Sequence, residues 1–345
     1  MSAPQHSPLR TVDATTCTLC GSVGDPLYTG MRDRLFGAPG EWTLLRCAGC
    51  GLVWLHPRPA AADLSRLYER YHTHAEPHTD PERVSWVQRA VRRAVPAAVL
   101  GYGDAVPHAR ERALGRMLSW IGPLREAGVR SAMGLPAEAR GRLLDVGCGS
   151  GLFLSVMQDL GWRIAGVELD PEAAEVARRE LDSDEIHAGE LADLALPPDT
   201  FDAITLSHVI EHLLDPVAVL GECRRLLRPG GWLAVATPNA RSLGRQRFGR
   251  AWRGWEPPRH IHVFDPTTLR RVVEAAGFRV RSVSTPASAA PFLWAESAAL
   301  AGRPEGGAAA SNGIRAAAFW GWEYLLCRLG RPAGEEVLLL AERPA

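Results

Sequence analysis

Four cysteines in the first fifty residues form two pairs with the same local pattern. Cys17 and Cys20 belong to Cys-Thr-Leu-Cys-Gly, and Cys47 and Cys50 belong to Cys-Ala-Gly-Cys-Gly. Each pair fits a tight turn, because the following glycine tolerates a left-handed backbone and frees amide groups to face the sulfurs. Two such turns supply four thiolates in a tetrahedron, the ligand set of a closed structural zinc site. The pairs therefore predict a zinc ribbon with a role in folding or recognition, and two redox pairs are the alternative.

A glycine-rich segment, Asp145-Val146-Gly147-Cys148-Gly149-Ser150-Gly151, lies between a short apolar run and a helical pattern. Its G-x-G-x-G spacing lets a ligand approach the backbone closely, but it differs by one residue from the G-x-G-x-x-G loop of dinucleotide-binding folds. Glu168 follows Gly147 by 21 residues, at the end of the next apolar run. A carboxylate at that point can accept both hydrogen bonds of a ribose diol. These features predict a nucleoside pocket that does not require a phosphate.

Histidines and a glutamate cluster farther along the chain. His208, Glu211 and His212 follow an apolar run that ends at Leu206, and His262 precedes a helical pattern. If a helix begins at His208, the spacing of three puts Glu211 on the same face with His212 beside it. We expect these side chains to face an acceptor cavity, where His208 or His262 removes a hydroxyl proton. The alternative is a structural role, in which Glu211 and His212 cap and brace the helix.

The second half of the chain alternates apolar runs with helical patterns, which predicts an α/β doubly wound sheet with parallel strands and right-handed crossovers. Asp170 and Asp265 are the expected caps of two of the helices. The predicted strands cover 142–146, 163–169, 201–206, 232–237, 280–283 and 337–341, and the predicted helices cover 152–160, 170–181, 217–227 and 266–276.

The sequence predicts that the chain is divided into three regions. We expect a zinc ribbon with a trailing helix over 1–73, a helical connector or lid over 74–139, and the α/β core over 140–345. An apolar insertion at about 285–332 is rich in tryptophan and alanine. Burial on the sheet is the preferred interpretation of this insertion, and an acceptor lid, a dimer face and a membrane-surface element are the alternatives.

Composition sets limits on function. The 345 residues are 46% hydrophobic, which is enough for a large core, and 39 basic residues balance 39 acidic ones. A chain without net charge has no global field to hold a polyanion, so nucleic acid is not expected as the main partner. No stretch reaches the roughly eighteen uninterrupted apolar residues of a membrane helix. With a polar segment at 1–10, these features lead us to expect a cytoplasmic protein with reduced cysteines.

The segments Leu143–Gly151 and Gly166–Glu168 resemble the class I S-adenosylmethionine-dependent methyltransferases. The resemblance implies a mostly parallel seven-stranded, Rossmann-like sheet and S-adenosylmethionine as cofactor. It implies that the glycine loop contacts the methionine part of the cofactor, that Glu168 binds the ribose hydroxyls and that the segment 189–191 reaches the adenine edge. The implied cofactor-binding residues are Asp145, Gly147, Cys148, Gly149, Gly151, Glu168, Leu169, Glu190, Leu191 and Ser207.

The histidine cluster is similar to a methyltransferase branch in which Glu-x-x-Glu-His and a later histidine hold a divalent metal. Glu211, His212 and His262 match that pattern, whereas His208 replaces the first glutamate. A His-Glu-His-His set suits zinc, manganese or iron better than magnesium. Ubiquinone methyltransferases share the first segment, and small-RNA 2′-O-methyltransferases share both parts.

The ribbon ahead of the core resembles deoxysugar C-methyltransferases and other ribbon-bearing methyltransferases of glycan and natural-product pathways. The favoured function is O-methylation of a small-molecule acceptor, a sugar, glycan or natural-product intermediate, assisted by a histidine. The alternatives are a docking protein that retains a cofactor site, a metal-assisted RNA 2′-O-methyltransferase, and a deoxysugar C-methyltransferase. The sequence leaves the oligomeric state open.

Overall fold

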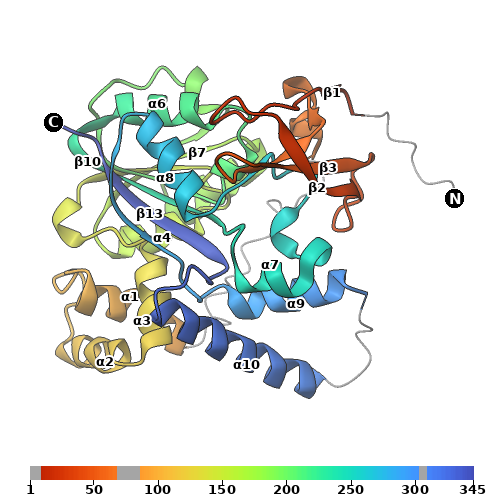
Figure 1. Cartoon of the computed structure of the whole chain (residues 1–345). Helices are drawn as coiled ribbons and strands as arrows, with labels where there is room; N and C mark the ends of the chain where they lie inside the picture. Colours follow the sequence, from red (N-terminus) through yellow and green to blue (C-terminus); the bar gives the residue numbers. More distant parts are fainter. Residues whose placement is uncertain (1–8, 68–85, 303–308) are drawn as a thin grey trace, which may run out of the picture.

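A seven-stranded sheet forms the centre of the molecule (Figure 1). The computed structural model describes residues 9–67, 86–302 and 309–345. The strand order is β12-β13-β10-β9-β6-β7-β8, in which the five strands from β10 to β8 are parallel and β13 runs antiparallel to both β10 and β12. The strands are β6 (Arg142–Val146), β7 (Arg163–Glu168), β8 (Ile186–Ala188), β9 (Phe201–Ser207), β10 (Leu227–Pro238), β12 (Arg279–Ser284) and β13 (Glu336–Glu342). The predicted doubly wound, mostly parallel sheet is confirmed.

Helices connect the strands close to the predicted positions. They are α4 (Leu152–Asp159), α5 (Pro171–Leu181), α6 (Pro216–Leu226), α7 (Leu243–Phe248) and α8 (Pro266–Ala275). Asp170 caps α5 by accepting the Glu172 N–H, and Asp265 caps α8 in a capping box with Thr268. Both predicted caps are confirmed. The sequence analysis missed β8, which has three residues, and α7, which has six.

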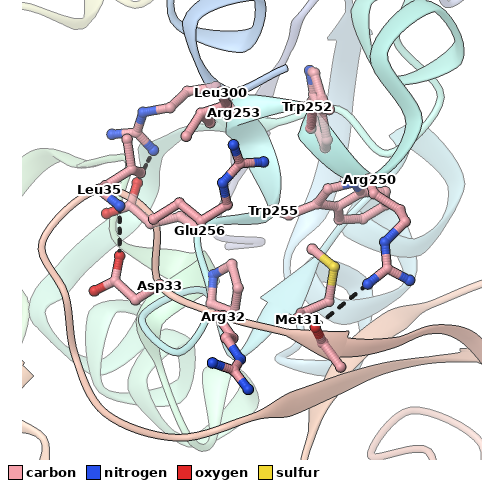
Figure 2. A pocket seen from close by; sticks show the side chains of 14 residues that line it. Met31, Arg32, Asp33, Leu35, Arg250, Trp252, Arg253, Trp255, Glu256 and Leu300 are labelled. Atoms are coloured by element: carbon pink, nitrogen blue, oxygen red, sulfur yellow. Dashed lines mark hydrogen bonds and ion pairs between the residues drawn. The ribbon is translucent and has the colours of Figure 1, made fainter. Parts of the chain in front are cut away.

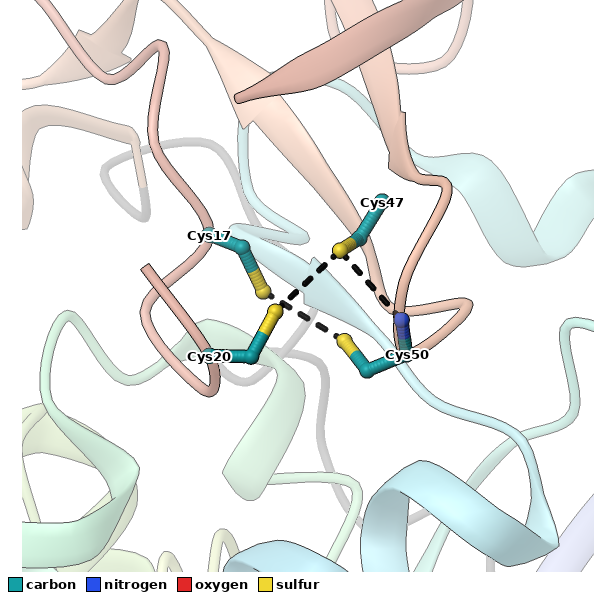
Figure 3. A group of neighbouring side chains, drawn as sticks. All are labelled: Cys17, Cys20, Cys47 and Cys50. Atoms are coloured by element: carbon teal, nitrogen blue, oxygen red, sulfur yellow. Dashed lines mark hydrogen bonds between the residues drawn. The ribbon is translucent and has the colours of Figure 1, made fainter. Parts of the chain in front are cut away.

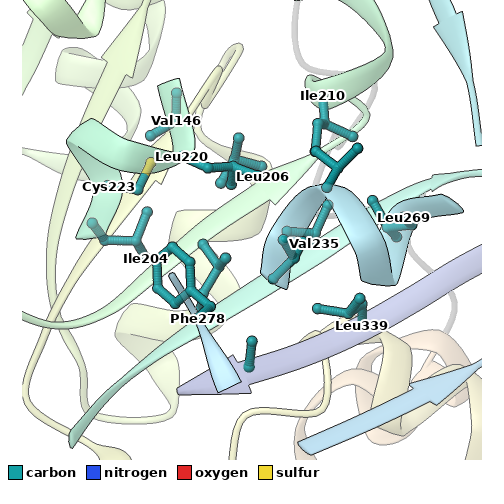
Figure 4. Close-up of a cluster of buried hydrophobic side chains, with 14 of the residues drawn as sticks. Val146, Ile204, Leu206, Ile210, Leu220, Cys223, Val235, Leu269, Phe278 and Leu339 are labelled. Carbon is teal, nitrogen blue, oxygen red and sulfur yellow. The ribbon is translucent and has the colours of Figure 1, made fainter. Parts of the chain in front are cut away.

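Alternate residues of the strands pack on opposite faces of the sheet, as the two-residue period of a strand requires. Leu144, Ile204 and Val235 join the cluster that includes α6 and α8. Ile204 and Val235 are labelled in Figure 4. Leu143 and Ala203, the neighbours of Leu144 and Ile204, join a second cluster that includes α4 and α5. The strands are therefore buried on both faces of the sheet, which explains why their sequences are continuous apolar runs.

A smaller sheet holds the cysteine region against the core (Figure 1). Its order is β11-β4-β3-β2, all antiparallel, and its strands are β2 (Gly24–Met31), β3 (Trp42–Cys47), β4 (Val53–His56) and β11 (His262–Val263). β3 pairs antiparallel with both β2 and β4. Because β11 comes from the chain after β10, the core supplies the fourth strand. Cys17, Cys47 and Trp54 share one buried cluster with core residues such as Ile210.

Three helices, α1 (Trp86–Val99), α2 (Ala109–Ser119) and α3 (Gly122–Ser131), correspond to the helical pattern before the core. The described part of the segment expected to form the trailing helix of the ribbon contains two short 3-10 turns, Ala61–Asp63 and Ser65–Leu67, and residues 68–73 lie outside the described residues. The short strands β1 (Thr11–Val12) and β5 (Arg58–Pro59) pair with each other.

The apolar insertion forms α9 (Ala290–Leu300) and α10 (Ala309–Arg328), which lie side by side at one end of the molecule (Figure 1). Leu293 and Ser297 of α9 are buried, whereas Ile314, Trp322 and Leu325 of α10 are exposed. The main contacts of α9 are with α7, α10 and the turns Gly249–Ala251 and Arg253–Trp255, so the preferred expectation of burial on the sheet is wrong for this helix. Within the described residues, no helix combines the length and the apolar character needed to cross a membrane.

Candidate active site and cysteine centre

The glycine loop joins the carboxyl end of β6 to α4, at the edge of the sheet where open α/β folds bind ligands. Gly147, Gly149 and Gly151 all have positive φ, at 73°, 54° and 86°. The Gly147 N–H donates to the Val167 carbonyl at 2.7 Å, which ties the loop to β7. A Cβ on Gly147 would lie 2.4 Å from Val209, whereas a Cβ on Gly149 would have no atom within 4 Å. Gly149 therefore faces open space.

Glu168 ends β7 beside this open space. Its Oε2 accepts the Gly149 N–H at 2.8 Å, and its Oε1 accepts the Asp170 N–H at 3.0 Å. An ionised carboxylate has about four acceptor positions, so both oxygens retain capacity for hydroxyl donors. Glu168 is buried, whereas the next residue, Leu169, is exposed with an apolar side chain. The carboxylate and the glycine loop are held in one fixed arrangement.

The segment that begins at Gly189 reaches the same place. The Gly189 N–H donates to the Glu168 carbonyl at 2.8 Å, and no atom lies within 4 Å of a Cβ built on Gly189. Glu190 is exposed and Leu191 is buried. The structure therefore brings together, along one edge, the loop, the acidic residue and the third segment that the sequence assigned to a nucleoside.

Asp145 lies beneath the loop with 2% of its surface exposed. Its Oδ1 accepts the Thr205 hydroxyl at 2.6 Å. Burial raises the pKa of Asp145 to about 7, although the hydrogen bond from Thr205 opposes this shift. Burial also raises the pKa of the Cys148 thiol, which follows Gly147 in the loop. Both side chains are buried, so a ligand at the loop would meet mainly the backbone of these two residues.

His208 is exposed to solvent and also pairs with two carboxylates. Its Nε2 is 2.6 Å from Glu336 Oε1, and its Nδ1 is 3.3 Å from Glu211 Oε1. Partial loss of solvation opposes the charge on His208, but pairing with Glu211 and Glu336 raises its pKa to about 10. Arg130 of α3 also binds Glu336, with Nε to Oε2 at 2.8 Å, and donates to Ser207 Oγ at 3.3 Å. His208 is therefore held as a cation in a network at the carboxyl end of β9.

His212 belongs to a second group. Glu211, His212 and His260 bring one ligand atom each within 4.8 Å of one another. The His212 Nδ1 is 3.1 Å from the Arg259 carbonyl, and the His260 Nδ1 is 2.8 Å from the Gly254 carbonyl. A carbonyl oxygen only accepts, so both Nδ1 atoms carry the proton, and in a neutral ring the lone pair is then on Nε2.

The comparisons with known proteins agree with this geometry. The methyltransferase domain family matches residues 123–283. A ubiquinone biosynthesis O-methyltransferase of Thiobacillus denitrificans is 30% identical over 48% of this chain and 74% of its own length. A malonyl-[acyl-carrier protein] O-methyltransferase of Serratia marcescens is 33% identical over 50% of this chain and 67% of its own length. The chain belongs to the class I S-adenosylmethionine-dependent methyltransferases.

A ubiquinone biosynthesis O-methyltransferase of Xanthomonas campestris is 38% identical over 34% of this chain and 51% of its own length. The chain thus spans about half the length of that relative. The residues of the methyltransferase that surround the open space fit its cofactor. Gly149 and Gly189 leave room where a side chain would intrude, and Glu168 keeps acceptor positions for a diol.

His262 lies apart from the other candidate catalytic residues of the methyltransferase. It is 1% exposed, its Nδ1 is 3.1 Å from the Leu213 carbonyl, and its Nε2 is 3.2 Å from Thr18 Oγ1 of the first cysteine turn. Burial lowers the pKa of His262 to about 4. The late histidine that the structure places with Glu211 and His212 is His260, and His262 instead joins the ribbon to the core.

The four cysteines converge as the sequence pattern predicts (Figure 3). Their sulfurs lie within 4.8 Å of one another, with Cys17 to Cys50 at 3.5 Å and Cys20 to Cys47 at 3.3 Å. A zinc ion with Zn–S bonds of about 2.3 Å separates tetrahedral sulfurs by about 3.8 Å, so the set fits this ion. The two following glycines have positive φ, 74° at Gly21 and 85° at Gly51, as the turns require.

Sequence reasoning missed three residues of the site: Arg130, His260 and Glu336. Arg130 lies in a helix outside the expected core, and Glu336 begins the strand β13. Nothing local distinguishes them from surface charges, because their roles depend on contacts with residues 77 to 206 positions away. His260 carried a signal, since it is two residues from His262, but spacing alone does not select between them.

Proposed function

We propose that this protein transfers a methyl group from S-adenosylmethionine to a hydroxyl group of a small-molecule acceptor, such as a sugar, glycan or natural-product intermediate. Family membership and the open space beside Gly149 and Glu168 support the cofactor. The three relatives described above are named O-methyltransferases, which supports oxygen as the atom methylated. The cluster of polar groups at the carboxyl ends of β9 and β10 supports an acceptor site there.

The chain's own residues have distinct roles in this proposal. Glu168 binds the ribose hydroxyls, the glycine loop accommodates the methionine part, and Gly189 with Leu191 and the exposed Leu169 border the adenine. When bound, the cofactor supplies an electrophilic methyl group on its sulfonium. The protein has mainly to hold the acceptor in line with that group, because orientation accounts for much of the rate of such a transfer.

We assign the base to His212. Its Nδ1–H is anchored on the Arg259 carbonyl, so the ring has a fixed orientation and its Nε2 can accept a proton. His208 is less suited, because a cation between Glu211 and Glu336 has no free lone pair. Glu211 positions the cluster: it is fully buried, and its Oε2 accepts the Thr237 hydroxyl at 2.9 Å.

An acceptor screen tests the function. The full chain is incubated with S-adenosylmethionine and hydroxylated acceptors, and release of S-adenosylhomocysteine is measured. We expect turnover with at least one sugar or natural-product acceptor, and a His212→Gln variant that binds S-adenosylhomocysteine normally but loses about 100-fold or more in kcat. His187→Gln, a histidine on β8, is the matched control with unchanged kcat. Equal kcat in the His212 and His187 variants contradicts the assignment of the base.

The group of Glu211, His212 and His260 supports a second candidate, metal-assisted transfer. One carboxylate and two imidazoles form a ligand set suited to iron, manganese or zinc. Elemental analysis distinguishes the two mechanisms. A bound metal that disappears in His260→Ala, while the zinc held by cysteines remains, supports metal assistance, and a metal content unchanged by this substitution contradicts it.

We further propose that Cys17, Cys20, Cys47 and Cys50 hold one structural zinc ion. Four thiolates complete a tetrahedron and leave no position for a substrate, so the ion stabilises the fold. The site joins two turns that pack against the core, with Thr18 bound to His262. The zinc would therefore fix the ribbon against the strand β11.

A further inference from the structure

A cavity of about 350 Å³ lies between the ribbon and the core (Figure 2). On one side it is lined by residues 30–35, at and after the end of β2, and on the other by residues 250–253 and 255–257 and by Leu300 at the end of α9. The segment 250–257 belongs to the chain that leaves the carboxyl end of β10. Glu256 Oε2 in its wall lies 3.7 Å from His260 Nε2, and His260 and His212 bring ligand atoms within 4.8 Å of each other. The cavity wall therefore adjoins the histidine group at which we place the acceptor. Its volume is within the range of small-ligand sites.

The charged residues that line the cavity are unbalanced. Four of them are arginines, and two are acids, Asp33 and Glu256. Asp33 is buried, and its oxygens accept the backbone N–H groups of Leu35 and Phe36 at 3.0 Å each and the Arg259 guanidinium at 3.0 Å. Its acceptor capacity is thus largely used inside the protein.

Glu256 is used in the same way. Its Oε1 accepts Arg259 Nε at 2.8 Å, and its Oε2 accepts Arg253. Arg259 is fully buried behind the cavity wall, so the two acids and the pair Arg253 and Arg259 neutralise one another. The remaining arginines of the lining decide the charge that a ligand meets.

These remaining arginines are Arg32, Arg34 and Arg250 (Arg32 and Arg250 are labelled in Figure 2). Arg32 pairs with Glu41 at the surface. Arg250 donates to the Thr29 carbonyl at 2.7 Å and lies over the Tyr28 ring at 5.8 Å, which fix its guanidinium without neutralising it. Within residues 9–67, 86–302 and 309–345, Arg34 and Arg250 form no ion pair with a carboxylate.

We infer that this cavity, which we call the arginine pocket, binds a phosphate group carried by the methyl acceptor. A guanidinium matches phosphate through paired N–H donors, and an exposed arginine without a carboxylate is available to such a ligand. Met31, Trp252 and Trp255 form an apolar wall, and a 350 Å³ space is larger than a phosphate ion needs. The ligand is therefore an organic phosphate. The inference rests on the proposed function for the identity of the ligand as acceptor.

Calorimetry on the full chain tests the arginine pocket with three probes: inorganic phosphate, pyrophosphate and glucose 1-phosphate. We expect saturable binding at one site, with glucose 1-phosphate at least as tight as inorganic phosphate. The double variant Arg34→Gln/Arg250→Gln should weaken this binding about tenfold or more, because two charged donors are lost. Both side chains are exposed, so the fold should be preserved.

Arg271→Gln, an exposed arginine of α8 outside the pocket, is the matched control and should leave phosphate binding unchanged. S-adenosylhomocysteine binding, measured on the same samples, reports the cofactor site separately and should be equal in all three proteins. No binding of any probe, or equal weakening in the double variant and the control, overturns the pocket. Tighter binding of inorganic phosphate than of glucose 1-phosphate overturns the assignment to an acceptor. If the wild type binds the phosphate probes but not S-adenosylhomocysteine, the proposed function is refuted and the assignment of a phosphate site to the arginine pocket is retained.

Discussion

Comparison of Gly149→Ala with Gly230→Ala should separate the effect of an added methyl group on cofactor binding from its effect on backbone strain. Gly149 has a φ of 54°, and a Cβ there meets no protein atom within 4 Å. Gly230 also has a positive φ, 77°, and a Cβ with no atom within 4 Å, but it lies at the start of β10, far along the strand from the cofactor edge. Alanine in the left-handed region costs about 1–2 kcal/mol at either position. The two variants should therefore lose similar stability.

Only Gly149→Ala places a methyl group in the space assigned to the cofactor. Overlap of one added methyl group with a ligand in a fixed site costs about 1–3 kcal/mol, as overpacking does in a core, which weakens binding roughly 5-fold to 150-fold. The assay is calorimetric titration with S-adenosylhomocysteine, with urea unfolding of each variant to compare stability. Equal affinity in the Gly149→Ala and Gly230→Ala proteins would refute the placement of the cofactor against the loop.

Three further outcomes test the electrostatic and metal assignments. The pKa of Asp145 is raised to about 7 in the folded protein, so its contribution to stability is present at low pH and is lost as pH rises through about 7. Between about pH 5 and pH 8, the free energy of unfolding of the wild type should fall by about 2–3 kcal/mol relative to that of Asp145→Asn. Urea unfolding at each pH measures this difference. A strong chelator, or Cys20→Ser, should remove about one zinc per chain and lower the Tm, and an unchanged metal content would exclude the cysteine site. Arg259→Leu leaves Asp33 buried without its cation and should destabilise the protein by about 3–5 kcal/mol in chemical unfolding; a loss below about 1 kcal/mol would show that this pair does not hold the ribbon to the core.

Much of the sheet could be predicted from the sequence because its signals are local. The strand β6 begins and ends at the predicted residues, and the caps Asp170 and Asp265 mark two helix starts. These features depend on short apolar runs and on side chains that bind amides two or three residues away. The glycine loop is similar, because its positive φ angles require glycine at three positions.

The histidine site could be predicted only in part, because long-range pairing decides it. His262 is paired with Trp54 of the ribbon in β11, which directs it to Thr18 and leaves His260 beside His212. That register depends on a strand more than 200 residues earlier in the chain. The same reason explains Arg130, whose partner Glu336 lies 206 residues away.

The central claim is that S-adenosylmethionine binds along the edge formed by the glycine loop and Glu168, with its ribose on the carboxylate. Titration of the full chain with S-adenosylhomocysteine, alongside Glu168→Ala, tests it most directly. We predict one molecule bound per wild-type chain and an affinity reduced about tenfold or more in the variant, because the charged acceptor of the diol is lost. An absence of saturable binding to the wild type, or the same affinity in both proteins, would contradict the claim.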